Sequence, residues 1–133
     1  MVSSLGSIRT VLANWNADSF DSTEFETAMK HVLAGQTPTE SDQISVNAPD
    51  IAENGRTVPL EISSSMGNIE SISIVIENNP RPHVSTFFIQ PGMESFVSTR
   101  VKMRETSDVI ALVKTDQGIF MAKKMVKVTA GGC

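Results

Sequence analysis

The residues best suited to chemistry stand at the end of the chain. Cys133 is the only cysteine, and it follows Ala130, Gly131 and Gly132. A thiolate is a nucleophile and a site of oxidative sulfur chemistry, although an unperturbed thiol has a pKa of about 8.5 and is mostly protonated at neutral pH. Glycine lacks a Cβ, so this segment should be thin and loose. Residues 130–133 are therefore predicted to form a flexible arm that reaches roughly 13 Å when extended and holds the thiol out to another protein.

The sequence leaves other roles of Cys133 open. A single cysteine cannot form an internal disulfide, so its thiol is free, capped or shared with a partner. The cysteine could also be incidental, or introduced for coupling. A thiol enzyme would need His31 or His83 as a base, and a mobile arm lacks the fixed geometry that catalytic groups require. We therefore predict no catalytic residue in this chain.

The other candidate ligands predict neither a metal site nor a cofactor site. His31 and His83 show no His-x₃-His or Glu-x₂-His spacing. Each histidine is predicted to lie at the surface or at a rim. The seven methionines are predicted to fill the core and not to form a soft-metal site, and they include Met93, Met103, Met121 and Met125 at alternating positions in strands.

Length and composition fit one globular domain. The chain has 133 residues, of which 40% are hydrophobic and 20% are charged, and a chain of this length can bury about two thirds of its unfolded surface. No apolar run approaches the length of about eighteen residues that a membrane span needs. The acidic composition and the absence of Tyr argue against a nucleic-acid partner.

Charge is divided unevenly along the chain, whose formal net charge is −4. Residues 1–77 hold eleven acidic and three basic residues, whereas residues 78–133 hold four acidic and eight basic residues. Seven of these bases lie between Arg100 and Lys127, in the segments that lead to the cysteine. They would suit small anions or an acidic partner near the arm, or they could form a solvated strand face.

The first third of the sequence predicts helix. An amphipathic helix of about three turns is expected up to a stop at Gly35, with Asp21 or Thr23 as its N-cap and Glu24 or Glu26 three residues on. Its apolar stripe consists of Phe25, Ala28, Met29, Val32 and Leu33. A weaker stripe predicts one or two earlier turns and comprises Leu5, Ile8 and Leu12, with Trp15 packing nearby.

From Ile44 onward the apolar period changes to two, which predicts strands separated by turns. Asn54-Gly55 and Asp116-Gln117-Gly118 are expected to be tight turns. Asn79-Pro80-Arg81-Pro82 should end a strand, because proline cannot donate to the ladder. Strands are predicted at residues 44–48, 58–62, 72–76, 84–89, 96–103, 109–113 and 119–128.

These elements predict a mainly β protein. Seven short strands after one or two helices favour an immunoglobulin-like antiparallel β-sandwich. The domain would consist of a helical segment at residues 1–39 that packs on the sandwich, the sandwich itself at residues 40–129 and the arm at residues 130–133.

Several motifs together carry a family resemblance. The chain closes on Val128-Thr129-Ala130-Gly131-Gly132-Cys133, and earlier it contains Ile51-Ala52-Glu53-Asn54-Gly55, Val58-Pro59-Leu60, Asn79-Pro80-Arg81-Pro82 and Val97-Ser98-Thr99-Arg100-Val101. From the amphipathic helix to its end, the sequence closely resembles the SoxY family, the sulfur carrier subunits of the periplasmic thiosulfate-oxidising Sox system.

The resemblance implies a sandwich that forms a heterodimer with a second small β subunit, SoxZ. It also implies that sulfur intermediates are attached covalently to Cys133, on a narrow stem of Gly131 and Gly132. A c-type cytochrome complex would conjugate thiosulfate, a dimanganese hydrolase would release sulfate, and a sulfane dehydrogenase would oxidise the remaining sulfur. The chain itself would be a carrier and not an enzyme, without a cofactor of its own.

Two features depart from the family pattern. Family members usually end in Gly-Gly-Cys-Gly-Gly and are exported, usually by the twin-arginine route. This sequence stops at Cys133 and shows no leader, so we expect a shortened C-terminus and a start codon, Met1, placed on a mature periplasmic form. The competing hypothesis is a non-catalytic interaction module whose terminal thiol only forms an intermolecular disulfide.

Overall fold

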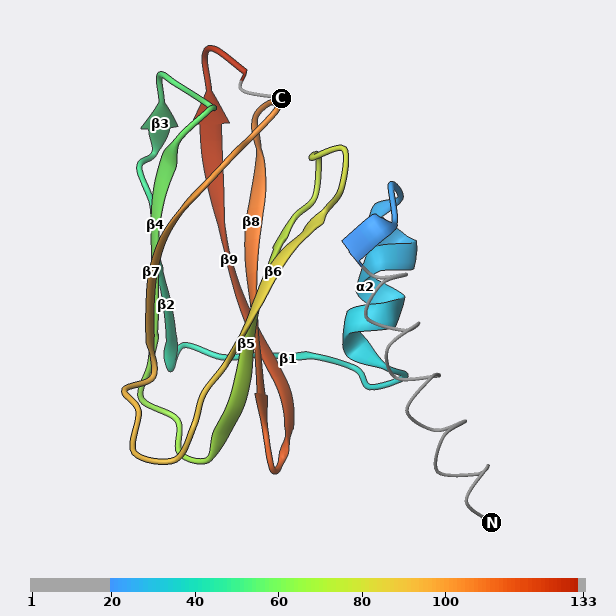
Figure 1. The fold of residues 1–133 in the computed structure, drawn as a ribbon, viewed down its shortest axis with the longest axis vertical. Coiled ribbons are helices and arrows are strands. Elements are labelled where there is room, and N and C mark those ends of the chain that lie inside the picture. The colour runs from blue at the N-terminus through green and yellow to red at the C-terminus, as the bar shows by residue number, and fades with distance from the viewer. Residues whose placement is uncertain (1–19, 132–133) are drawn as a thin grey trace.

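The computed structural model describes residues 20–131, which form three stacked layers (Figure 1). A three-stranded sheet packs on a larger sheet, and one helix covers part of the other face of the larger sheet. The weaker apolar stripe and Trp15 lie outside the described residues, as do Gly132 and Cys133.

The larger sheet has the strand order β1-β9-β8-β5-β6, and β3 also pairs with β9. Its strands are β1 (Thr39–Glu40), β3 (Ile51–Ala52), β5 (Ile69–Ile76), β6 (His83–Phe88), β8 (Ser107–Thr115) and β9 (Gly118–Val128). The smaller sheet has the order β2-β4-β7. Its strands are β2 (Ile44–Asn47), β4 (Val58–Ser64) and β7 (Phe96–Val101).

The predicted immunoglobulin-like sandwich is confirmed, with all seven predicted strands present. The long strands pair antiparallel, whereas β1 and β3 run parallel to β9. These two strands were not predicted, because two residues are too few for a period of two to show. They pair with Phe120–Met121 and Lys127–Val128, and they thereby close part of the free edge of β9.

Apolar side chains that alternate along the strands fill the space between the sheets. Leu60 and Ile62 of β4 and Ile72 and Ile74 of β5 are almost completely buried in one cluster. Burying a side chain of this size contributes about 1.5–3 kcal/mol. Met103, which follows β7, closes the same cluster, so the core extends to the end of the sandwich from which β9 leaves.

The prediction that the methionines fill the core holds for only part of the set. Met103 is fully buried and Met121 is half-buried. Met93 and Met125 are 53% and 56% exposed, so the prediction is wrong for these two. The inward position next to Met125 belongs to Val126, and a period of two does not reveal which face of a strand is covered.

Helix α2 (Phe25–Leu33) packs on the outer face of the larger sheet. The predicted apolar stripe is confirmed, because its large side chains contact a second buried cluster. That cluster consists of Val75, Ile110, Leu112 and Ile119. The predicted cap is wrong: the N-cap is Glu24, whose side chain makes no capping bond, and Ser22 forms a local turn with it instead.

The loops that follow β3, β5 and β7 lie at the same end of the sandwich as the end of β9, and we call this end the arm end. The predicted turn at Asn54-Gly55 forms there, although it joins β3 to β4 and not β2 to β4. The Asn54 side-chain oxygen accepts a hydrogen bond from the Arg56 amide at 3.0 Å. At the other end, the predicted turn at Asp116-Gln117-Gly118 joins β8 to β9 as a hairpin, and Gly118 has a positive φ of 137° there.

Replacing Ile74 by Ala should lower the free energy of unfolding by about 2–5 kcal/mol, because it leaves a cavity between the sheets. Urea denaturation followed by circular dichroism measures the change. The control is Met93→Ala at an exposed position, where we expect a change within about 0.5 kcal/mol. Equal effects of the two substitutions would contradict the assigned core.

Candidate functional site

The predicted arm begins where β9 leaves the larger sheet (Figure 1). Ala130 and Gly131 are exposed and follow the end of the strand. Gly132 and Cys133 lie outside the described residues, so the attachment of sulfur to Cys133 stays a prediction. The described geometry concerns the base of the arm.

The turn after β3 holds the base of the arm through backbone hydrogen bonds. The Gly55 amide donates to the Ala130 carbonyl at 2.7 Å, and the Thr129 amide donates to the Ala52 carbonyl at 3.1 Å. A hydrogen bond of this kind contributes about 0.5–1.5 kcal/mol net. Residues 129 and 130 are therefore part of the folded scaffold, although they lie beyond β9.

Gly131 lies against the backbone of the β7–β8 loop. A Cβ added at Gly131 would overlap the carbonyl oxygen of Arg104. The φ of Gly131 is not in the left-handed region, so the position requires glycine because two backbones approach closely and not because of its conformation. Sequence analysis predicts a loose stem, and the structure adds this steric reason for the first of its two glycines.

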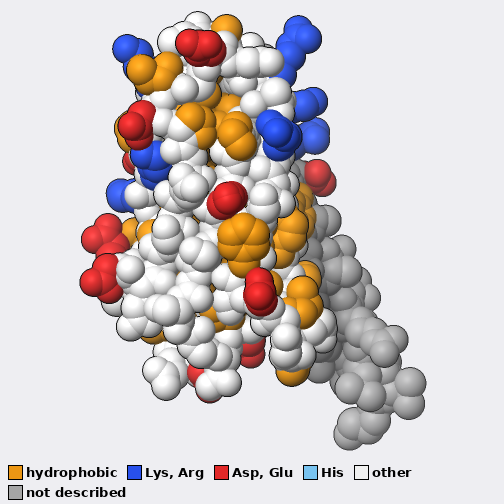
Figure 2. Space-filling model, turned by 90° about the vertical axis from the view of Figure 1, so that its left-hand side faces the viewer, with side chains coloured by type: hydrophobic (Ala, Val, Ile, Leu, Met, Phe, Trp, Pro, Cys, Tyr) orange, Lys and Arg blue, Asp and Glu red, His pale blue; other side chains and the backbone are white. Residues whose placement is uncertain are grey.

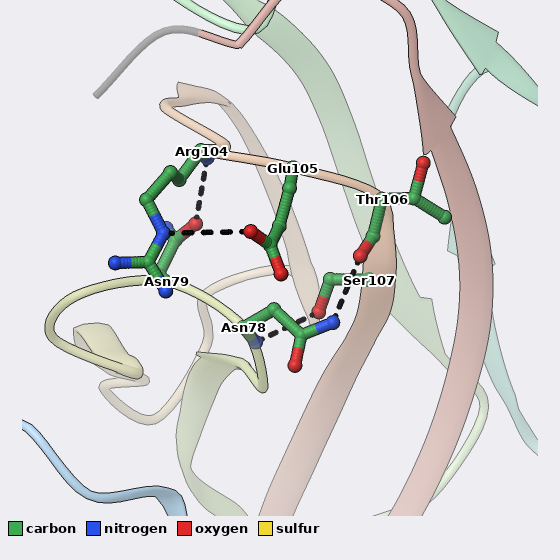
Figure 3. A network of polar contacts seen from close by, with 6 residues as sticks. All are labelled: Asn78, Asn79, Arg104, Glu105, Thr106 and Ser107. Carbon is green, nitrogen blue, oxygen red and sulfur yellow. Dashed lines mark hydrogen bonds and ion pairs between the residues drawn. The ribbon is translucent and has the colours of Figure 1, made fainter.

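Two asparagines hold the β7–β8 loop in place (Figure 3). The buried Asn79 side chain donates to the Lys102 carbonyl at 2.6 Å and accepts from the Arg104 amide at 3.0 Å. Asn78 donates to the Thr106 carbonyl at 2.8 Å. These bonds orient the stretch of backbone whose carbonyl oxygen lies against the base of the arm.

Two further bonds join these loops to each other and to β9. The Met103 amide donates to the Gly55 carbonyl at 2.7 Å, and the Val128 amide donates to the Thr106 hydroxyl at 2.9 Å. We call residues 52–55 and 102–106, together with Asn78 and Asn79, the collar. Within the collar, the loops at residues 52–55 and 102–106 contact the base of the arm, and Asn78 and Asn79 hold the second of these loops in place.

The sequence predicts only a strand end at Asn79-Pro80-Arg81-Pro82, whereas in the structure Asn79 also holds the β7–β8 loop of the collar. A signal was present, because Asn side chains often bond to backbone in turns. The partners could not be found in this way, since Lys102 and Arg104 lie 23 and 25 residues further along the chain. Two of the motifs that carried the family resemblance, Ile51–Gly55 and Asn79–Pro82, thus lie in the loops that build the base of the arm.

Positive charge gathers at the arm end. The strand ends and loops there carry eight basic and five acidic residues, at 50–57, 77–82, 100–109 and 123–131. The rest of the sandwich from residue 39 onward carries one basic and six acidic residues. Figure 2 views the outer side of the smaller sheet, and the Lys and Arg side chains visible there lie toward the arm end. The uneven charge along the sequence is therefore also uneven in space.

Part of this positive charge is paired with carboxylates. Lys124 lies 2.5 Å from Asp50, and it holds the pKa of that carboxyl below its ordinary value through a hydrogen bond and charge attraction. Arg104 lies 3.7 Å from Glu105. Both pairs are largely exposed and should add little to stability.

A groove of about 1240 Å³ runs between α2 and the outer face of β5 and β6. Its floor is polar: the Thr86 hydroxyl lies 2.9 Å from the Ser73 hydroxyl and 2.8 Å from Nε2 of His83. Phe20 stacks on the His83 ring with centroids 4.0 Å apart. Apolar side chains such as Phe88 complete the lining.

His83 is 4% exposed, so its predicted place at the surface or a rim is wrong. Burial lowers the pKa of His83 to about 4, and a hydrogen bond with the backbone of Ser85 acts weakly in the opposite direction. The ring is therefore neutral at pH 7. The other histidine, His31, is half-buried on α2.

Within residues 20–131, no three His, Cys, Asp or Glu side chains are arranged to hold a metal ion. In the same part of the chain, no helix is long and apolar enough to cross a bilayer.

Comparisons with known proteins agree with this architecture. The family described as "Sulfur oxidation protein SoxY" matches residues 29–133. A solved structure of the sulfur carrier protein SoxY from Chlorobium limicola f thiosulfatophilum is 32% identical, with a TM-score of 0.72 over 80% of this chain and 96% of that one. A superoxide reductase (neelaredoxin) from Ignicoccus hospitalis shares the fold at 18% identity, with a TM-score of 0.59 over 65% of this chain and 80% of that one. No curated protein matches the chain significantly.

Replacing Gly131 by Ala should displace the base of the arm, because the added Cβ overlaps the Arg104 carbonyl. We expect amide hydrogen exchange at Gly55, measured by NMR, to become about tenfold faster as its bond to Ala130 weakens. The control is Gly67→Ala, where no atom lies within 4 Å of the added Cβ. Unchanged exchange at Gly55 in the Gly131 variant would refute the contact.

Acidification should destabilise the protein through His83. Its pKa is 6.5 in the unfolded chain and about 4 in the folded one, so its contribution to stability is fully present above pH 6.5 and is lost as the pH falls toward 4. Between pH 7 and pH 5 this amounts to about 2 kcal/mol in the free energy of unfolding. Urea titrations at both pH values should show this fall in the free energy of unfolding of the wild type and a smaller fall in His83→Gln.

The matched control for this titration is His31→Gln. Its free energy of unfolding should fall between pH 7 and pH 5 by as much as that of the wild type. An NMR titration of the wild-type His83 ring gives a second measurement that does not depend on a variant. A pKa near its ordinary value there would contradict the buried neutral ring.

Proposed function

Because the chain belongs to the SoxY family of sulfur oxidation proteins, we propose that it is a sulfur carrier of thiosulfate oxidation whose cargo is attached covalently to Cys133. The observation that supports this function best is the construction of the arm base. The loops at residues 52–55 and 102–106 hold residues 129–131, and Cys133 follows Gly131 after one further residue.

The collar suits a carrier because it fixes the chain up to Gly131 on the sandwich and leaves only a short tether between Gly131 and Cys133. An enzyme would need its reacting groups held in a defined geometry, whereas a carrier needs a thiol that other active sites can enclose. Backbone groups of the collar are paired with other backbone groups or with the Asn79 side chain. In this proposal, the chain presents the sulfur and partner enzymes supply the chemistry.

Loading of the carrier would be an oxidation. The Cys133 thiol and thiosulfate form a sulfur–sulfur bond, release one proton and give two electrons to a c-type cytochrome complex. A dimanganese hydrolase would then add water to the terminal sulfonate, which leaves as sulfate with the release of two protons, while a persulfide anion stays on Cys133. A sulfane dehydrogenase oxidises the remaining sulfur further. Cargo of this kind is anionic throughout, which agrees with the positive arm end.

The same proposal includes a permanent partner and a location. The carrier forms a heterodimer with SoxZ, and it works in the periplasm, where the cytochrome complex and the two other enzymes meet it. Gly132 completes the stem between Gly131 and the thiol.

The test is the adduct itself. Carrier incubated with the thiosulfate-oxidising cytochrome complex and thiosulfate should gain a sulfur-containing mass, seen in intact-mass spectra and removed by reductant. Cys133→Ser should gain none, because the chain has no other thiol. A variant that keeps the adduct would sink the proposal. A reducible disulfide dimer together with unchanged thiosulfate turnover in Cys133→Ser would favour the interaction module.

A further inference from the structure

We propose that the enzyme that conjugates thiosulfate to Cys133 docks on the arm end of the larger sheet, at an apolar contact of Ile51 and Met125 bordered by Lys123 and Lys127. We call these four residues the docking patch. The inference rests on the proposed function and adds the surface that the enzyme binds and the chemistry of its partner site. That site is an apolar contact with an acidic rim.

The reach of the arm requires a docking surface close to the collar. Gly131 is held against Arg104, so only Gly132 separates it from Cys133, and the two Cα–Cα steps span roughly 7 Å when fully extended. This is about half of the reach expected from four free residues. An enzyme that acts on Cys133 must therefore contact the protein surface around the arm base.

The apolar half of the docking patch is formed by two neighbouring strands. Ile51 of β3 pairs with Lys127 of β9, and Met125 precedes Lys127 by two positions. Ala52 and Val126 point into the core, so alternation places Ile51, Met125 and Lys127 together on the outer face. Ile51 and Met125 are each 56% exposed, and apolar side chains exposed side by side indicate a contact surface.

The outer face of the larger sheet is only partly covered by the chain itself. Helix α2 packs over Leu112 and Ile119, but it leaves Met125 exposed. The other exposed large hydrophobic residues lie elsewhere, in or near the groove and at the far ends of β6 and β7, and are Phe20, Phe88, Met93 and Phe96. Among the described residues, Ile51 and Met125 are thus the exposed large hydrophobic residues at the arm end.

Charge selects an acidic partner for this surface. Within residues 20–131, neither Lys123 nor Lys127 forms an ion pair, and both are exposed. The half-buried Asp108 of β8 pairs with Met125 of β9 and is an acidic neighbour on this face. These two lysines and the excess of basic residues at the arm end would attract an enzyme whose binding site has an acidic rim, and they would orient it as it approaches.

A carrier must also leave each enzyme, which calls for a small interface. Contacts that bury less than about 1,200 Å² in total are typical of transient encounters. Two apolar side chains bordered by two lysines match this class. Loading should therefore be fast at low salt and should slow as ionic strength rises.

The experiment measures loading of the full chain by the purified thiosulfate-oxidising cytochrome complex, with haem reduction as the readout. Met125→Asp and Lys127→Glu should each raise the KM for the carrier about tenfold, and Lys127→Glu should weaken the salt dependence. Matched controls at the far end are Met93→Asp and Lys114→Glu, which should load like the wild type. Reaction of Cys133 with a small thiol reagent should be the same in all of these proteins.

Each outcome decides the proposal. Wild-type loading of both patch variants, or slowed loading in the far-end controls instead, would overturn the docking patch while leaving the carrier function intact. Failure of the wild type to be loaded at all would instead overturn the proposed function. Loss of SoxZ binding, or of a self-dimer, in Met125→Asp without a change in KM would assign the docking patch to that partner and refute the inference.

Discussion

The side-chain amide of Asn79 is the interaction on which the arm end depends. Its two ends bond to backbone on either side of Met103, and Met103 is both a core residue and a donor to Gly55. A buried amide with both ends satisfied has one orientation, and leaving either group unpaired would cost about 1–3 kcal/mol. Through this residue the packing of the sandwich core determines where the Arg104 carbonyl lies, and with it where the arm begins.

The fold could be predicted from the sequence because its signals are local. Alternating residues marked every long strand, and the stripe from Phe25 to Leu33 marked the helix. The two-residue strands β1 and β3 escaped prediction, since their pairing depends on an edge of β9 that is far away in sequence. The burial of His83 was missed for a related reason: its neighbours Phe20, Ser73 and Thr86 come from three separate segments.

The candidate site also has a part that could be predicted from the sequence and a part that could not. The glycine context of Cys133 and the motifs of the chain point to a presented thiol without any structure. What the motifs do at the arm base depends on contacts between residues more than twenty positions apart, and no period in the sequence encodes such contacts. Gly131 is the clearest case. The glycine content of the arm predicts a flexible backbone, whereas the Arg104 carbonyl beside Gly131 leaves no room for a side chain.

The contact between Gly131 and Arg104 also has a meaning for how this protein can change over evolution. It divides the C-terminal sequence into a part whose length is fixed by the fold and a part whose length is free. An insertion before Gly131 would shift the glycine away from the Arg104 carbonyl, whereas an insertion after it would leave this contact intact and lengthen the stretch that leads to Cys133. If Cys133 is presented to partner enzymes as proposed, the spacing between this glycine and the cysteine sets how deep their active sites can lie.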